Sequence, residues 1–426
     1  MRAASKLKRT GRALCVSALA MAATAAPALA GGFDVREQSA LFQGMSFAGA
    51  AAGGTALSSM FWNPAAAGYV SDGITIDSSY SLIIPRAEVT VESISGGIPI
   101  NGDPSVDVGR DALVPASYAA YRFSDDLVFA ISMNSQFGLT TKPDSFSWAG
   151  DLLGRTSKVF SINAVPTVAY QIAPGVQIGA GVQVQYLELK AFKASGGIPG
   201  TLGNAVTTNL EGDDIGVGYT LGINLTPAAG TSIGLGFRSS IRHDVDGEFT
   251  APGFNPSIAA DIELPEKLTL GIRQDLAPGI RAHATVEWTN WSRLGVIPIQ
   301  GLPPPAALDF QWEDGWYFAV GGEYDYSDKL TLRTGFGYEI SPIREPSQRL
   351  VQLPDNDRYW LSAGASYELG DFMGLLKDAK VDAAYTHIFV EEGDFSRHPS
   401  GGPAPVFTGS TDSAVDIISI GIRSKL

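Results

Sequence analysis

The chain has 426 residues, of which 45% are hydrophobic and 17% are charged, and it contains 49 glycines and carries a formal net charge of −14 at pH 7. This apolar content excludes a disordered chain, and charged residues fall well short of the roughly 25% found in a typical soluble protein. The acidic balance argues against nucleic acid as a partner, because an acidic surface repels a phosphate backbone.

Residues 1–30 have the layout of a secretory signal peptide. Their basic head consists of Arg2, Lys6, Lys8, Arg9 and Arg12. The alanine-rich apolar run that follows is shorter than the ~20 residues that a membrane-spanning helix needs, and small residues at 28–30 suit a signal peptidase. We therefore expect cleavage near Ala30-Gly31. Because the single cysteine, Cys15, precedes this point, we expect neither a disulfide nor a cysteine-bound metal in the mature chain.

Residues 31–72 lack the alternation of a β-strand. They are rich in alanine, phenylalanine and methionine and nearly free of lysine, which favours packing against the rest of the protein. If the segments after residue 72 form a wide barrel, its wall side chains cannot fill the lumen. We therefore expect residues 31–72 to form an N-terminal hatch inside it. A flexible periplasmic tail is the alternative.

From about residue 73 onward, apolar residues alternate with small or polar residues in stretches of roughly 10 to 15 positions. In residues 176–188, for example, valine, isoleucine, alanine and tyrosine occupy the even positions before 188, while glycine and glutamine occupy the odd positions up to 185. Since successive side chains of a strand point to opposite faces, each stretch predicts a strand with one apolar and one polar face. No run of 18 apolar residues follows the leader, so no transmembrane helix is predicted.

The sequence predicts an all-β protein, a transmembrane antiparallel β-barrel of about 14 strands over residues 73–426. The strands are expected to start near residues 73, 113, 127, 158, 176, 210, 231, 258, 280, 314, 329, 358, 379 and 413. Short turns alternate with long Pro/Gly-rich loops, as in outer-membrane barrels. Aromatic residues lie near the ends of the apolar faces and charged residues on the polar faces, as expected for interface girdles and a polar lumen. A soluble β-protein with scattered edge aromatics is the alternative.

Four stretches carry more specific motifs. They are G-F-D-V-R-E-Q-S-A at 32–40, the small-residue run with F-W-N-P-A-A-A-G that ends at 68, P-A-S-Y-A-A-Y at 115–121 and N-S-Q-F-G-L-T-T-K at 134–142. With these motifs the chain resembles the FadL family of outer-membrane long-chain fatty acid transporters, over essentially the whole mature chain. The strongest motif residues in the hatch are Glu37, Gln38, Ser39, Asn63 and Pro64.

The resemblance implies a monomeric fourteen-stranded barrel with a hatch, in the outer membrane of a Gram-negative-type envelope and without a cofactor. Members take up hydrophobic compounds through capture at an external groove, transfer to an internal pocket, hatch movement and lateral exit beside a kinked third strand. Such a path avoids exposing an acyl chain to water, which costs about 0.8 kcal/mol per CH₂ group. The expected partners are a hydrophobic small molecule and the membrane lipids.

Two sets of residues are predicted on or near the third strand. The loop at 139–157 holds apolar side chains that are expected to form the external groove: Phe146, Trp148, Leu152 and Leu153. Exposed apolar clusters mark binding surfaces, although these side chains could instead pack onto neighbouring loops. Phe137 and Gly138 end the third strand, where a glycine permits a kink, and are predicted at the lateral gate.

The internal pocket is predicted near residues 187–193, where the lumen-facing positions become apolar. The residues expected there are Leu187, Leu189, Lys190 and Lys193, with a lysine pairing a carboxylate head group; a solvated loop lysine is the alternative. By family analogy, Phe33 and Val35 are expected in the pocket wall. Further basic residues that could pair with a carboxylate, or with lumen glutamates at 287, 323 and 339, are Arg238, Arg333 and Arg358.

Enzymatic motifs are missing from the sequence. The four histidines have no metal-binding spacing, and neither a G-x-S-x-G elbow nor a P-loop occurs. We therefore expect neither an enzyme nor a metal protein. Two classes of function remain: a channel for fatty acids or for aromatic and alkane hydrocarbons, and a structural or adhesive outer-membrane barrel whose loops bind a host or a phage. The apolar loop residues and the hatch favour the first.

Overall fold

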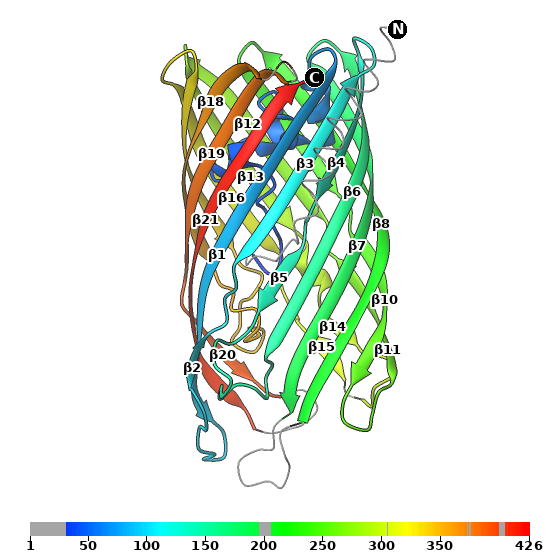
Figure 1. The fold of residues 1–426 in the computed structure, drawn as a ribbon, viewed down its shortest axis with the longest axis vertical. Helices are drawn as coiled ribbons and strands as arrows, with labels where there is room; N and C mark the ends of the chain where they lie inside the picture. The colour runs from blue at the N-terminus through cyan, green and yellow to red at the C-terminus, as the bar shows by residue number, and fades with distance from the viewer. Residues whose placement is uncertain (1–30, 196–205, 305, 373, 375, 400–404) are drawn as a thin grey trace.

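The computed structural model describes residues 31–426 apart from 196–205, 305, 373, 375 and 400–404. The predicted signal peptide lies outside the described residues. A single closed barrel accounts for most of the chain, and the hatch lies inside it (Figure 1). No helix among the described residues is long and apolar enough to span a membrane.

Fourteen antiparallel segments form the wall of the barrel in the described part of the chain. Eleven are single strands: β1 (Ile74–Ile94), β3 (Ala112–Arg122), β6 (Thr156–Ala173), β7 (Val176–Ser195), β8 (Val206–Ala228), β13 (Ile280–Thr289), β16 (Gly315–Asp325), β17 (Leu330–Ile340), β18 (Arg358–Phe372), β19 (Leu376–Val390) and β21 (Phe407–Lys425). Three are interrupted: β4 (Leu127–Asn134) with β5 (Gly138–Thr141), β9 (Thr231–Arg238) with β10 (Ile241–Thr250), and β11 (Ser257–Leu264) with β12 (Lys267–Ala277). β1 pairs with both β3 and β21, which closes the barrel and removes the exposed edges that a bilayer does not tolerate.

The predicted fold class is confirmed. Most expected strand starts lie within three residues of the observed ones, but β8 begins at Val206 and β21 at Phe407, earlier than the expected 210 and 413. Short elements in the connections were not predicted: β2 (Ser105–Asp107), β14 (Val296–Pro298), β15 (Ala307–Asp309), β20 (Gly393–Arg397) and the 3-10 helix η5 (Trp291–Arg293).

Short turns gather at the end of the barrel where the chain finishes, the upper end in Figure 1. We call this the short-turn end, and the opposite end the long-loop end.

The two faces of the wall differ as the alternation predicts. On β7, Val182 and Val184 point outward and are 49% and 41% exposed, whereas Gln183 and Gln185 are fully buried in the lumen. Outward aromatic residues with large exposure include Trp316, Tyr324, Tyr359, Tyr367 and Tyr385. An apolar outer face with aromatic residues matches a surface that contacts lipid.

The hatch consists of short helical turns joined by bends. These are α2 (Ala40–Gln43), η2 (Ala50–Ala52), η3 (Leu57–Phe61) and η4 (Pro64–Tyr69). The side chain of Ser39 caps α2, and that of Asn63 caps η4, in which Pro64 takes the first position. Almost every hatch residue is buried against the wall. This packing explains the low charge and the alanine-rich composition of residues 31–72.

Several wall glycines allow the hatch to lie directly on the strand backbone. A Cβ atom at Gly234 would lie 1.8 Å from the carbonyl oxygen of Ala51, and one at Gly236 would lie 1.8 Å from that of Trp62. A Cβ atom at Gly335 would lie 2.1 Å from the carbonyl carbon of Met45. No side chain fits at these positions. The high glycine content of the sequence therefore reflects contact between wall and hatch as well as tight turns.

Candidate functional site

The third transmembrane strand is interrupted between β4 and β5, and Figure 1 shows β5 as a short separate arrow. β4 pairs with β3 only along Ser117–Arg122, whereas β5 pairs with β6. Residues 112–116 of β3 therefore pair with β1 on one side and with no described strand on the other. We call this unpaired stretch, together with the facing residues 135–137, the wall break.

The start of the hatch docks against the wall break from inside the barrel. The amide of Val35 donates to the carbonyl of Gln136 at 2.8 Å, and the amide of Gly138 donates to the carbonyl of Phe33 at 2.9 Å. Asp34, between the two hatch residues, forms an antiparallel bridge with Phe137.

These contacts supply a physical reason for the interruption. Backbone groups that would otherwise pair with β3 are satisfied by the hatch. The side chain of Gln38 adds a hydrogen bond of 2.6 Å to the carbonyl of Ser135. Gly138 is not among the glycines with positive φ, so the break does not depend on a left-handed glycine.

An aromatic cluster lies next to the wall break. The ring of Phe33 packs edge-on against Trp291 at 5.0 Å and Phe137 at 5.8 Å, and tilted against Trp312 at 6.0 Å between centroids. Both tryptophans come from the connection between β13 and β16. The cluster continues toward the long-loop end through buried apolar side chains: Val89, Val91, Val106, Leu139, Leu187, Val245, Leu264, Ile343, Leu353, Phe395 and Phe407. Buried apolar side chains therefore extend from the loops to the wall break.

Next to the aromatic cluster, buried ion pairs fasten the hatch to the wall. Arg36 Nη1 lies 2.7 Å from Glu287 Oε1, and the Arg36 guanidinium lies 3.8 Å above the ring of Tyr317. The ammonium of Lys267 contacts the carboxylate of Asp34. Removing one partner of such a buried pair leaves an uncompensated charge, which is strongly destabilising.

Glu37, the next hatch residue, is buried, and neither of its carboxylate oxygens accepts a hydrogen bond from another described residue. Burial raises the pKa of the Glu37 carboxyl from 4.5 to about 7. The folded state then holds this proton more tightly than the unfolded chain does. The stability that the proton brings is fully present below the unfolded pKa and is lost as the pH rises through about 7.

We therefore expect the isosteric Glu37→Gln protein to unfold at a higher temperature than wild type at about pH 8, and at a similar temperature at about pH 4, because it carries no charge at either pH. Thermal unfolding of the detergent-purified protein at a series of pH values measures this difference. An unchanged pH dependence in Glu37→Gln would show that other groups cause it.

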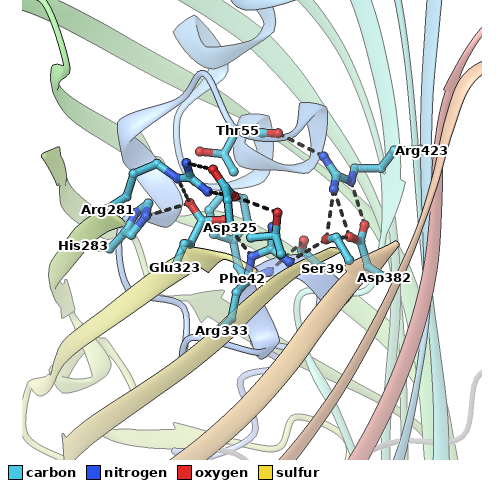
Figure 2. A network of polar contacts seen from close by, with 12 residues as sticks. Ser39, Phe42, Thr55, Arg281, His283, Glu323, Asp325, Arg333, Asp382 and Arg423 are labelled. Carbon is cyan, nitrogen blue, oxygen red and sulfur yellow. Dashed lines mark hydrogen bonds and ion pairs between the residues drawn. The ribbon is translucent and has the colours of Figure 1, made fainter. Parts of the chain in front are cut away.

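A second, polar region lies between the hatch and the short-turn end. A cavity of about 640 Å³ is lined there by charged side chains from several wall strands and by Gly54 and Thr55 of the hatch. Figure 2 shows its network: Arg281 and Arg333 contact Glu323, while Arg423 contacts Asp382 and the carbonyl of Thr55. Such a lining is unfavourable for an apolar compound, because each CH₂ would face water and charges.

The four residues predicted for the external groove have different environments. Phe146 is 91% exposed, whereas Trp148 is only 3% exposed. Leu152 and Leu153 are half-buried and pack against the apolar cluster. Of the four side chains, only that of Phe146 is therefore accessible to a compound outside the protein. The role of all four residues in binding stays a prediction.

The predicted pocket residues fall on both faces of the wall. Phe33, Leu187 and Leu189 belong to or pack against the apolar cluster beside the wall break, and Val35 packs in the hatch core. Lys190 has the opposite parity: it lies on the outer face, exposed and paired with Glu211. The prediction of Lys190 in the pocket is therefore not supported.

Lys193 pairs with Thr208 through its backbone, and its side chain lies outside the described residues. Its predicted role as a carboxylate partner stays a prediction. Phe137 is the last residue of the wall break and Gly138 follows it as the first residue of β5. A role of either residue as a gate likewise stays a prediction.

The sequence did not single out Trp291, Trp312, Gln136 or Lys267. Two of the seven tryptophans of the chain fall in this one connection, a signal that could have identified the first two. Gln136 and Lys267 reach the site only through the docking of the hatch.

Together the fold and the site define a membrane barrel with a packed internal hatch, an apolar region inside its loops and a break in its wall.

A family model described as "Outer membrane protein transport protein (OMPP1/FadL/TodX)" matches residues 20–425. The chain belongs to this family. It is 25% identical over 413 residues to the "Long-chain fatty acid transport protein" of Escherichia coli O6:H1, covering 87% of this chain and 90% of that protein. It is 26% identical over 428 residues to "Outer membrane protein P1" of Haemophilus influenzae, covering 90% of each.

Solved structures share the fold. A FadL homologue from Pseudomonas aeruginosa superposes with a TM-score of 0.83 at 19% identity, over 92% of this chain and 99% of that one. The toluene transporter TbuX from Ralstonia pickettii superposes with a TM-score of 0.65 at 18% identity, over 91% and 99%. This chain is therefore an outer-membrane transporter of a family that moves hydrophobic compounds and is not enzymatic.

Proposed function

We propose that this protein takes up long-chain fatty acids or similar hydrophobic compounds and releases them sideways through the wall break. The observation that carries the proposal is the wall break itself, in which residues 112–116 of β3 have no described partner strand on the side of β4, and the hatch pairs with the facing residues 135–137. A lateral opening lets an acyl chain pass into the membrane without crossing water.

The proposed path begins at the long-loop end. A compound is captured near Phe146 and enters the apolar cluster around Phe33, Trp291 and Trp312. Withdrawal of the hatch residues from 135–137 then opens the wall break toward the lipid. The charged cavity between the hatch and the short-turn end supports sideways release over release through that end.

An aromatic or alkane hydrocarbon is the second candidate substrate. The aromatic cluster favours it, since the rings offer edge-on contacts to another ring without a charged partner. The E. coli relative is named for long-chain fatty acids and the R. pickettii structure for toluene, so relatives support both substrates.

Uptake in a Gram-negative host that lacks its own transporter of this family tests the proposal. We expect cells that produce this protein to take up radiolabelled oleate in a saturable manner, and cells with an empty vector not to. A matched assay with radiolabelled toluene distinguishes the second substrate. Equal uptake by producing and control cells for both compounds contradicts the proposed function.

A further inference from the structure

Arg238, the last residue of β9, is buried in the lumen and is held only by uncharged oxygens. Its Nε and Nη2 donate to Oε1 of Gln136 at 3.3 and 3.2 Å, and its Nη1 donates to the carbonyl of Phe61 at 2.9 Å. Nη2 also donates to Oε1 of Gln183. The guanidinium lies 4.5 Å above the ring of Phe61.

The other buried arginines of the transmembrane strands have carboxylate partners. Arg333 lies 2.7 Å from Glu323, and Arg358 pairs with Asp355. Arg238 forms no ion pair with a carboxylate of any described residue. A buried guanidinium without an anionic partner is unfavourable. An arginine in this situation is therefore a candidate for binding an anion that comes from outside the protein.

The two carboxylates whose charge acts on Arg238 from a distance are already engaged. Asp34 and Glu287 act on Arg238 from a distance. The carboxylate of Asp34 is paired with Lys267 and that of Glu287 with Arg36. Neither is free to serve as the partner of Arg238.

The three residues that hold Arg238 come from three parts of the protein. Phe61 belongs to the hatch, Gln136 to the wall break and Gln183 to β7. Arg238 therefore lies where the hatch meets the wall break. Movement of the hatch removes the carbonyl of Phe61 and frees at least one N–H group at the point where the proposed path leaves the barrel.

We propose that Arg238 binds the carboxylate of an anionic amphiphile at the wall break. This inference rests on the proposed function and makes its substrate a fatty acid rather than a hydrocarbon. A planar guanidinium can donate two parallel hydrogen bonds to a carboxylate, which replace those to Gln136 and Phe61. The head group is held at Arg238 while the acyl chain enters the membrane through the break.

The test compares two substrates of equal length in proteoliposomes that contain the purified full-length mature protein. We expect Arg238→Gln to lower the saturable flux of oleate by about tenfold or more while the flux of oleyl alcohol changes by less than about twofold. Arg238→Lys keeps the charge and should retain more oleate flux than Arg238→Gln. Heat-modifiable mobility on gels verifies that each variant is folded.

A second variant covers the case in which Arg238→Gln does not fold. Gln136→Glu is isosteric and gives Arg238 an internal carboxylate, so it should compete with the substrate and lower oleate flux selectively. An equal loss of oleate and oleyl alcohol flux, or no loss of oleate flux in either variant, contradicts the role of Arg238 alone. A wild-type protein that transports neither compound contradicts the proposed function itself.

Discussion

A disulfide between positions 34 and 137 is expected to stop uptake almost completely. Asp34 and Phe137 form an antiparallel bridge flanked by the hydrogen bonds of Val35 and Gly138. Such a pair has Cα atoms about 4.5 Å apart, within the range that a disulfide accepts. In the double variant Asp34→Cys/Phe137→Cys, the oxidised bond would tie the hatch to the wall break and prevent its withdrawal.

The reduced double variant is the control, since it carries the same substitutions without the cross-link. Because the only native cysteine, Cys15, lies in the predicted leader, no other thiol is expected to interfere. We expect oleate uptake to fall by about tenfold or more on oxidation and to return on reduction. Uptake that is equal in the oxidised and reduced states would show that the hatch need not leave the wall break.

Displacing the hatch by a wall substitution is expected to open the lumen. In Gly236→Val, the new side chain would occupy the place of the Trp62 carbonyl, whose oxygen lies 1.8 Å from where the Cβ atom would be, so the hatch cannot dock there. The lumen walls are polar: Gln183, Gln185 and Ser232 are buried there, and Ser232 donates to the carbonyl of Ala52 in the hatch. Without the hatch this surface would line a wet pore.

We expect the permeability of proteoliposomes to a disaccharide to rise by about tenfold in Gly236→Val, because the barrel wall persists while the hatch is displaced. Gly295→Val is the matched control, since no atom lies within 4 Å of a Cβ at position 295 and its φ is not positive. A folded Gly236→Val barrel that stays as closed as Gly295→Val would contradict the packing described for the hatch.

Much of the fold could be predicted because the alternation of residues along each strand separates its lipid-facing side from its lumen-facing side. The parity of β7 separates Val182 and Val184 from Gln183 and Gln185 in the sequence as it does in the structure. The same rule would have excluded Lys190 from the lumen, because it shares the parity of the outward Tyr186. Lys190 lies outside the lumen for this reason, and its role in binding a substrate stays untested.

The site could be predicted only in part, because it depends on contacts between distant segments. Nothing near residue 136 in the sequence indicates that Val35 will pair with it, or that Arg238 will contact it. Early starts of β8 and β21 have a similar origin, since these strands extend beyond their clearly alternating core and are supported by neighbours there. Local pattern predicts elements, whereas docking of the hatch creates the wall break.

Equilibrium binding of a radiolabelled long-chain fatty acid to the detergent-purified mature protein tests the central claim most directly. An uncharged hydrocarbon of similar length serves as the competitor. We expect saturable binding of the fatty acid that the hydrocarbon displaces only weakly, because the apolar cluster accepts both chains while a cationic side chain is available only to the carboxylate. Absence of saturable binding of either compound would contradict the account.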